Sequence, residues 1–99
     1  MEKNLSKTFN HGSIEELFGN ILKQLRNDKN LSQESLGFES GYHRTYISLL
    51  ERGKKSPSLK TIFQLAKALG IKPSEIMDRL QALYPDYSKK KHPRGRVKK

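Results

Sequence analysis

Apolar side chains recur through the middle of this chain at steps of three and four residues, the spacing that gives a helix one apolar face. The clearest stretch follows Ser13 and runs to about Asp28. Its apolar positions are Ile14, Leu17, Phe18, Ile21, Leu22 and Leu25. Ser13 is a typical N-cap residue, and Glu15 and Glu16 follow it in the first turn, where carboxylates favour the positive end of the helix dipole. The pattern predicts a helix over residues 13–28.

A helical spacing of apolar residues, in most cases after a capping serine, recurs along the chain and predicts four more helices. Their expected ranges are residues 32–40, 43–51, 58–69 and 74–84. The serines expected to cap are Ser32, Ser58 and Ser74. The strict alternation of a half-buried strand is absent from this stretch. The predicted fold class is therefore all-α, with five helices around one small core.

Individual residues indicate how these helices pack. Gly37 costs about 1 kcal/mol relative to alanine inside a helix, so it predicts a place where two helices approach too closely for a side chain. The apolar face expected in helix 58–69 comprises Leu59, Ile62, Phe63, Leu65, Ala66 and Leu69. The last helix has more apolar surface than a small core needs, and part of it is expected to pair with a second copy of the chain. The residues expected on this dimer surface are Ile76, Met77, Leu80, Leu83 and Tyr84.

The 99 residues carry a formal net charge of +10, which suits a polyanionic partner, but the charge is unevenly spread. Residues 89–99, KKKHPRGRVKK, hold seven Lys or Arg and no acid, whereas residues 1–88 hold 13 basic and 10 acidic side chains. The predicted organisation is a flexible arm over 1–12, a helical domain over 13–85 and a disordered basic tail over 86–99. Two interpretations of the tail stay open, an electrostatic arm along phosphates and a solubilising end.

Composition and spacing argue against several other functions. The chain has no cysteine, and His11, His43 and His92 are too scattered to suggest a metal site, so no cofactor is expected. Neither a Ser-His-Asp set nor a phosphate-cradling Gly-rich loop is present, so no enzyme is expected. The first residues lack the apolar run of a signal peptide, and no stretch of about 18 apolar residues occurs. We expect a cytoplasmic protein with no membrane partner.

Residues 31–53, LSQESLGFESGYHRTYISLLERG, form two short helical patterns hinged at Gly41. Two helices joined by a tight turn with glycine are the arrangement that lays its second helix in a DNA major groove. From Leu17 to Leu80 the chain resembles the lambda-repressor-like helix-turn-helix family, also called the XRE or Cro/repressor-type family. Within it the chain is most similar to small bacterial regulators, including the controller proteins of restriction-modification systems.

The resemblance implies base-contacting roles for three residues. Arg44 and Thr45 match early positions of the recognition helix, and Leu49, one turn on, matches a groove-facing position where relatives often carry a polar residue. A guanidinium can bond both O6 and N7 of guanine, for about 1 to 3 kcal/mol of discrimination, which makes Arg44 the strongest candidate. Thr45 can contact a thymine methyl group or a base edge, whereas Leu49 could read only methyl groups or none.

A second set of residues is expected to contact the DNA backbone: Gln33, His43, Tyr46, Lys54, Lys55 and Ser58. Gln33 opens the second helix, where its side chain and the helix amino end would address a phosphate. Two interpretations stay open for His43, a phosphate contact and a helix cap. Two also stay open for Tyr46, a hydroxyl contact with the DNA backbone and packing of its ring against helix 32–40.

The resemblance also implies a structural ion pair between Arg26 and Glu51, which would tie the first helix to the end of the recognition helix. The function expected is that of a homodimeric repressor or autoregulator of transcription. Its operator would be an inverted repeat with half-sites about 34 Å apart. The alternative is an antitoxin or adaptor whose helical domain mainly binds a partner protein such as a toxin. Arg44, Gln33 and the basic loop favour DNA, because a domain used only for protein interaction has no need of them.

Overall fold

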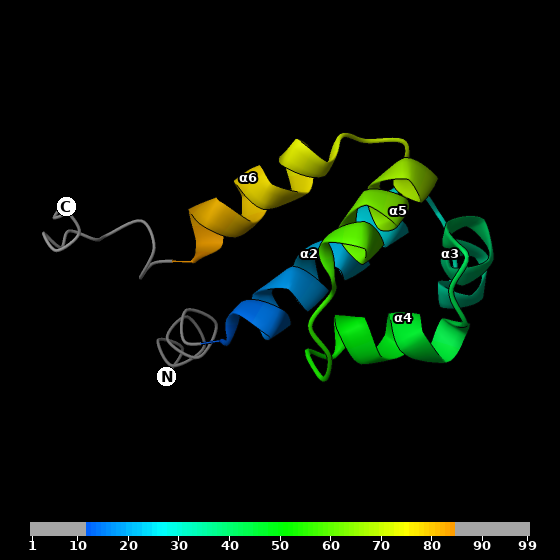
Figure 1. Ribbon diagram of the computed structural model, residues 1–99, viewed down its shortest axis with the longest axis horizontal. Helices are drawn as coiled ribbons and strands as arrows, with labels where there is room; N and C mark the ends of the chain where they lie inside the picture. The colour runs from blue at the N-terminus through cyan, green and yellow to red at the C-terminus, as the bar shows by residue number, and fades with distance from the viewer. Residues whose placement is uncertain (1–11, 85–99) are drawn as a thin grey trace, which may run out of the picture.

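The computed structural model describes residues 12–84, which form five α-helices and no strand, as the all-α prediction requires (Figure 1). The helices are α2 (Ile14–Asp28), α3 (Gln33–Ser40), α4 (Arg44–Glu51), α5 (Leu59–Leu69) and α6 (Pro73–Leu83). In this range no helix has both the length and the apolar character needed to cross a membrane. The expected arm and basic tail fall almost wholly outside the described residues.

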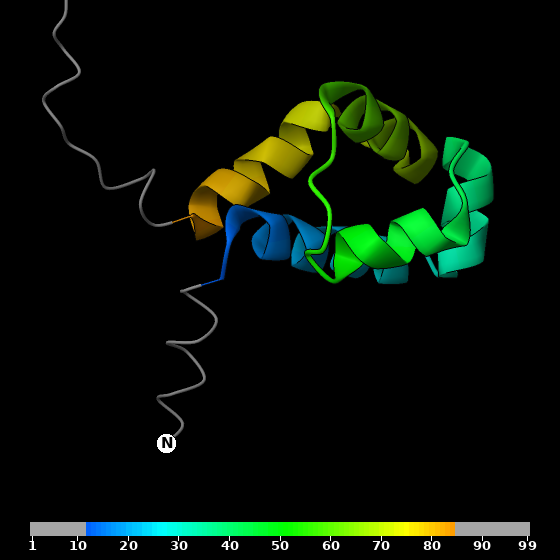
Figure 2. The same ribbon diagram turned by 60° about the horizontal axis from the view of Figure 1, so that its bottom comes forward.

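One apolar core joins all five helices. Five of its side chains, Leu36, Ile47, Leu50, Leu65 and Ala66, are completely buried. The long helix α2 contacts both α4 and α6. Figures 1 and 2 both place the end of α6 beside the beginning of α2, while α3 lies at the opposite side of the domain. The helix-turn-helix pair is therefore carried by α2 and α5, and α6 closes the other end.

Three of the four serines expected to cap helices do so. Ser13 and Glu16 form a reciprocal capping box, and the hydroxyls of Ser32 and Ser58 each accept a backbone N–H in the first turn. The prediction that Ser74 caps the last helix is wrong. Helix α6 begins at Pro73 and its N-cap is Lys72, two residues before the predicted cap, because proline has no N–H to satisfy at a helix start and its fixed φ suits that position.

The expected apolar faces are partly wrong as well. On α5, Leu59 is 77% exposed and Phe63 is 61% exposed, although the periodicity predicts both in the core. On α6, Ile76 and Leu80 are buried, so they belong mainly to the core rather than to the expected dimer surface. Helical spacing gives the side of a helix on which apolar residues lie, but the neighbouring helices decide which of them are covered.

Candidate DNA-binding surface

The turn between α3 and α4 is held by glycine at two positions. Gly41 ends α3 with φ +87°, a left-handed conformation that favours glycine. The N–H groups of Gly41 and Tyr42 both donate to the carbonyl of Gly37, each at 2.8 Å. A Cβ atom on Gly37 would lie 2.5 Å from the carbonyl oxygen of Tyr42, so the close approach predicted at this glycine is confirmed. The turn therefore sets the angle at which α4 leaves α3.

His43 is the N-cap of α4. Its Nδ1 accepts the backbone N–H of Thr45 at 3.0 Å, which bears out the capping interpretation. A ring nitrogen that accepts a hydrogen bond carries no proton, so the neutral imidazole has its N–H at Nε2. The side chain is exposed, and Nε2 can donate to an acceptor outside the protein. Capping by His43 and a phosphate contact are therefore compatible, because they use different nitrogens.

The first two residues of α4 are exposed, as a helix that reads bases requires. Arg44 and Thr45 both lie on the surface, whereas Ile47 and Leu50 of the same helix are buried in the core. Leu49 is half-buried. The eight residues of α4 thus divide into a side that anchors the helix and an amino-terminal end that is open to a ligand.

A buried network ties α4 to the two preceding helices. The guanidinium of Arg26 on α2 donates from Nε to Glu51 Oε2 at 2.6 Å and from Nη2 to Glu51 Oε1 at 2.9 Å, so the expected ion pair is present. Nη1 of the same guanidinium donates to the carbonyl of Leu31 at 2.8 Å. The hydrogen bond to Glu51 is the main cause of a raised pKa of Arg26; burial opposes it, and the nearby negative charge adds to it.

Gln33, the first residue of α3, joins this network. Its Nε2 donates to Glu51 Oε1 at 3.0 Å, and the side chain is half-buried. A carboxamide nitrogen carries two hydrogens, so a second N–H remains for a phosphate oxygen. Glu51 thereby orients the residue expected to contact DNA at the start of α3, which the sequence did not indicate.

Four hydroxyls meet where α5 begins. Thr61 Oγ1 lies 2.9 Å from the hydroxyl of Tyr42, 3.4 Å from that of Tyr46 and 3.0 Å from Ser58 Oγ. We call this set the hydroxyl cluster. The rings of Tyr42 and Tyr46 pack with their centroids 5.0 Å apart, so Tyr46 packs on a residue of the turn between α3 and α4. The sequence did not predict a role for Thr61, because 15 to 19 residues separate it from these two tyrosines.

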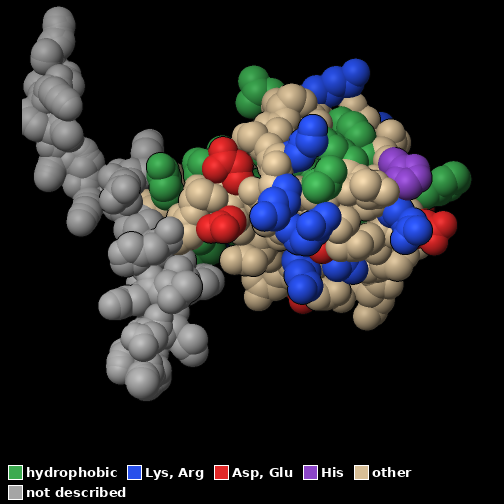
Figure 3. Space-filling model, turned by 90° about the horizontal axis from the view of Figure 1, so that it is seen from below, with side chains coloured by type: hydrophobic (Ala, Val, Ile, Leu, Met, Phe, Trp, Pro, Cys, Tyr) green, Lys and Arg blue, Asp and Glu red, His purple; other side chains and the backbone are tan. Residues whose placement is uncertain are grey.

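The loop from α4 to α5 is basic and exposed. Lys54 and Lys55 both lie on the surface. Arg52, which is not among the residues expected from the sequence, is also exposed, and its Nε donates to Ser48 Oγ at 3.2 Å. Figure 3 looks onto the molecule from the side of α4, and Lys and Arg side chains gather over the middle of this face. In residues 12–84 no group of acidic, histidine or cysteine side chains could hold a metal ion. The charge of this face suits a phosphate backbone.

The fold and this surface define a helix-turn-helix protein with an exposed recognition helix. A family model described as helix-turn-helix matches residues 22–76, more than half of the chain. The chain therefore belongs to this family, as the resemblance to lambda-repressor-like proteins predicts, and it is a DNA-binding transcriptional regulator of the controller-protein type.

Similar proteins include several controllers. Control protein C.BamHI of Bacillus amyloliquefaciens is 48% identical over 67 residues, which cover 67% of this chain and 83% of that protein. The crystal structure of the restriction-modification controller protein C.AhdI from Aeromonas hydrophila has a TM-score of 0.62 and 47% identity, covering 63% of this chain and 94% of that one. The controller C.Esp1396I, solved as a tetramer in complex with its natural 35 base-pair operator, has a TM-score of 0.68 and 24% identity, covering 77% of this chain and 100% of that one. At this lower identity the likeness shows a shared fold.

Proposed function

We propose that the chain is a sequence-specific regulator that binds an inverted-repeat operator as a homodimer and acts as a repressor or autoregulator of transcription. The observation that carries the proposal is the exposed amino-terminal end of α4, with Arg44 and Thr45 on the surface and the buried Arg26–Glu51 pair holding the helix behind them. The buried network holds α4 at its carboxyl-terminal end and thereby fixes the direction in which the exposed amino-terminal end points, as a task that depends on that direction requires.

The proposed contacts divide into two kinds. Arg44 and Thr45 would read base edges in the major groove, with Leu49 near methyl groups. The remaining contacts would go to phosphates from residues placed around α4: Gln33, His43, Tyr46, Lys54, Lys55 and Ser58. The hydroxyl hydrogen of Ser58 is directed to Thr61, so we expect the contribution of Ser58 to come through its place at the helix start. Such contacts position the protein without reading sequence.

The relatives support an operator as the ligand. C.BamHI is named a control protein, and C.AhdI is a restriction-modification controller that shares nearly half of its aligned residues with this chain. The operator in the C.Esp1396I structure is the operator of that protein. For this chain, the complex is only a precedent for operator binding by a protein of the same fold. We infer that a regulator of this kind acts on DNA in the bacterial cytoplasm.

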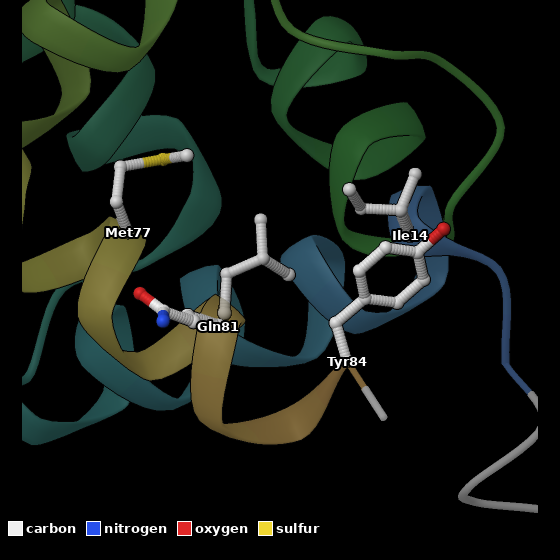
Figure 4. A pocket seen from close by; sticks show the side chains of 5 residues that line it. Ile14, Met77, Gln81 and Tyr84 are labelled. Carbon is white, nitrogen blue, oxygen red and sulfur yellow. The ribbon is translucent and has the colours of Figure 1, made fainter. Parts of the chain in front are cut away.

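Apolar side chains left exposed near α6 support the dimer. A shallow groove of about 300 Å³ is lined by Ile14 of α2 together with Met77, Leu80, Gln81 and Tyr84 (Figure 4). Ile14 is 39% exposed and Met77 is 44% exposed, so this groove presents apolar surface to solvent. We propose that a second copy covers this groove, and that Leu83 lies at its edge.

A selection from random-sequence duplexes tests the function directly. The wild-type chain should recover two copies of one short motif in inverted orientation, with centres about one helical turn apart. A chain carrying Arg44→Ala, selected in parallel, should recover a degenerate motif. Recovery of unrelated sequences by the wild type, or of one unpaired motif, would contradict the proposed symmetric operator.

A further inference from the structure

We propose that Thr61 is a positioning residue for DNA binding: the hydroxyl cluster it organises leaves the phenolic hydrogen of Tyr46 to donate to a DNA phosphate. The proposal deepens the proposed function and rests on it. It assigns a role to a threonine that is only 3% exposed and cannot itself reach DNA.

The hydroxyl cluster has one more hydrogen than its own contacts use. Tyr42, Tyr46, Ser58 and Thr61 supply four hydroxyls and therefore four hydroxyl hydrogens. The three oxygen-to-oxygen contacts, at 2.9, 3.4 and 3.0 Å, each use one hydrogen. One hydrogen is left over whatever the direction of each bond, and residues 12–84 show no further acceptor for it. Such a donor is available to an external acceptor, and a phosphate oxygen only accepts.

The directions of the bonds in the cluster give the spare hydrogen to Tyr46. Ser58 Oγ already accepts the N–H of Thr61 at 3.0 Å, which leaves its own hydrogen to donate to Thr61 Oγ1. Thr61 Oγ1 then has one lone pair and one hydrogen for the two phenols. Either atom can donate in these two contacts; we assign the phenolic hydrogen to the shorter one, 2.9 Å to Tyr42, so that Thr61 donates along the longer 3.4 Å contact to Tyr46. In this arrangement Tyr46 keeps its own hydrogen.

Tyr46 also lies in the right place to use this hydrogen. It belongs to the first turn of α4, two residues after Arg44, and its side chain is half-buried rather than enclosed. Thr61 lies in the first turn of α5, directly after the loop that carries Lys54 and Lys55. Because Thr61 contacts both tyrosines and the cap of α5, it joins the helix proposed to read bases to the segment proposed to hold phosphates. The phenol of Tyr46 is thereby held at the junction of the two.

Methylphosphonate scanning of the duplex selected by the wild type tests this assignment. Each substitution makes one phosphate neutral, and the affinity of each duplex is compared for the wild type, Tyr46→Phe and Tyr42→Phe. At one phosphate in each half-site we expect the wild type to lose affinity about tenfold, as for removal of a charge-assisted hydrogen bond. On the unmodified duplex, Tyr46→Phe should bind more weakly than the wild type by a similar factor. Neutralising that phosphate should then weaken the binding of Tyr46→Phe no further. Tyr42→Phe should keep the sensitivity of the wild type.

Two variants of the buried residue complete the test. Thr61→Val keeps the shape and removes the hydroxyl, so it should bind as Tyr46→Phe does, and adding Tyr46→Phe should cost little more. Thr61→Ser keeps the hydroxyl and should restore the sensitivity at that phosphate, which a purely structural threonine would not do. The preferred base sequence should be unchanged in all four variants, because a phosphate contact carries no sequence information.

The outcomes separate this inference from the proposed function. If Tyr46→Phe keeps the full sensitivity at every phosphate, or if Tyr42→Phe is the variant that loses it, the assignment is wrong while the operator stands. Wild-type binding by Thr61→Val also overturns the assignment. A wild-type chain that selects no duplex refutes the proposed function and, with it, the inference.

Discussion

Arg26 and Glu51 lie 25 residues apart in the chain and meet through two hydrogen bonds, one of 2.6 Å and one of 2.9 Å. Arg26 belongs to α2, and Glu51 is the last residue of α4. Both side chains are buried, and Glu51 also accepts from Gln33 at the start of α3. One carboxylate thus fixes three helices relative to one another, including the helix that presents Arg44.

Substituting Glu51 should destabilise the fold strongly. Glu51→Ala leaves the guanidinium of Arg26 buried without its charge partner, and breaking a buried pair in this way costs about 3 to 5 kcal/mol. Urea denaturation followed by circular dichroism measures the free energy of unfolding. A variant with the stability of the wild type would show that the pair contributes nothing to the fold.

The pH dependence of this pair follows from the direction of the pKa shift. The pKa of Arg26 is raised, so its contribution is complete below the ordinary arginine pKa and is lost only as pH rises through the raised value. The stability of the wild type should therefore show no loss from this group between roughly pH 7 and 10. Arg26→Lys is the matched control, because an ammonium group has an ordinary pKa of about 10.4 and lacks the two-donor fork.

Replacing Arg44 should change sequence preference and leave the fold intact. Arg44 is exposed, so Arg44→Ala should keep the melting temperature within about 2 °C. Discrimination at one G·C pair in each half-site should fall by about 1 to 3 kcal/mol, because two donors to O6 and N7 of guanine are removed. Competition binding with duplexes altered at single positions measures the effect.

Arg44→Lys separates charge from geometry at this position. The lysine keeps the positive charge but cannot make the paired hydrogen bonds of a guanidinium. We expect it to restore much of the overall affinity and little of the discrimination. Uniform weakening of all duplexes by Arg44→Ala would instead assign the side chain to a phosphate.

The helices are predictable from the sequence because their signals are local. Ser13, Ser32 and Ser58 cap the helices that follow them, and the spacing of apolar residues gives each helix its period. The close approach at Gly37 is also predictable from the sequence, because glycine inside a helix is unfavourable unless a neighbouring segment leaves no room for a side chain. The start of α6 at Pro73 is harder to predict, because Ser74 offers a competing cap one residue later.

The surfaces are less predictable, because they depend on which helices meet. Periodicity places Phe63 among core residues, yet the helices around α5 leave it exposed. Ile76 is expected on a dimer surface, and α6 buries it instead. The cluster around Thr61 joins residues far apart in sequence, and no pattern along the chain indicates such a meeting. Long-range pairing of this kind needs the three-dimensional arrangement.

The groove beside α6 makes a prediction about self-association. Met77→Glu places a charge in the groove, and a two-fold interface would bring it close to the same charge on the second copy. The dimer dissociation constant, measured by sedimentation equilibrium, should rise at least about tenfold, with little change in melting temperature because Met77 is 44% exposed. Phe38→Glu is the matched control, since Phe38 is 85% exposed on α3 and does not line the groove. Equal effects of both variants would refute this dimer surface.

The charge of residues 89–99 should affect how the affinity for DNA depends on salt concentration. If these seven basic residues lie along phosphates, removing them should reduce the slope of log affinity against log salt by about 0.9 for each phosphate that they neutralise. A chain of 99 residues with the same seven positions changed to glutamine is the control, because it keeps the length and removes the charge. Both chains should select the same operator, since specificity is proposed to lie in α4. A slope unchanged by either alteration would leave the segment as a solubilising end, and the attraction to DNA would then come from the face around Lys54 and Lys55.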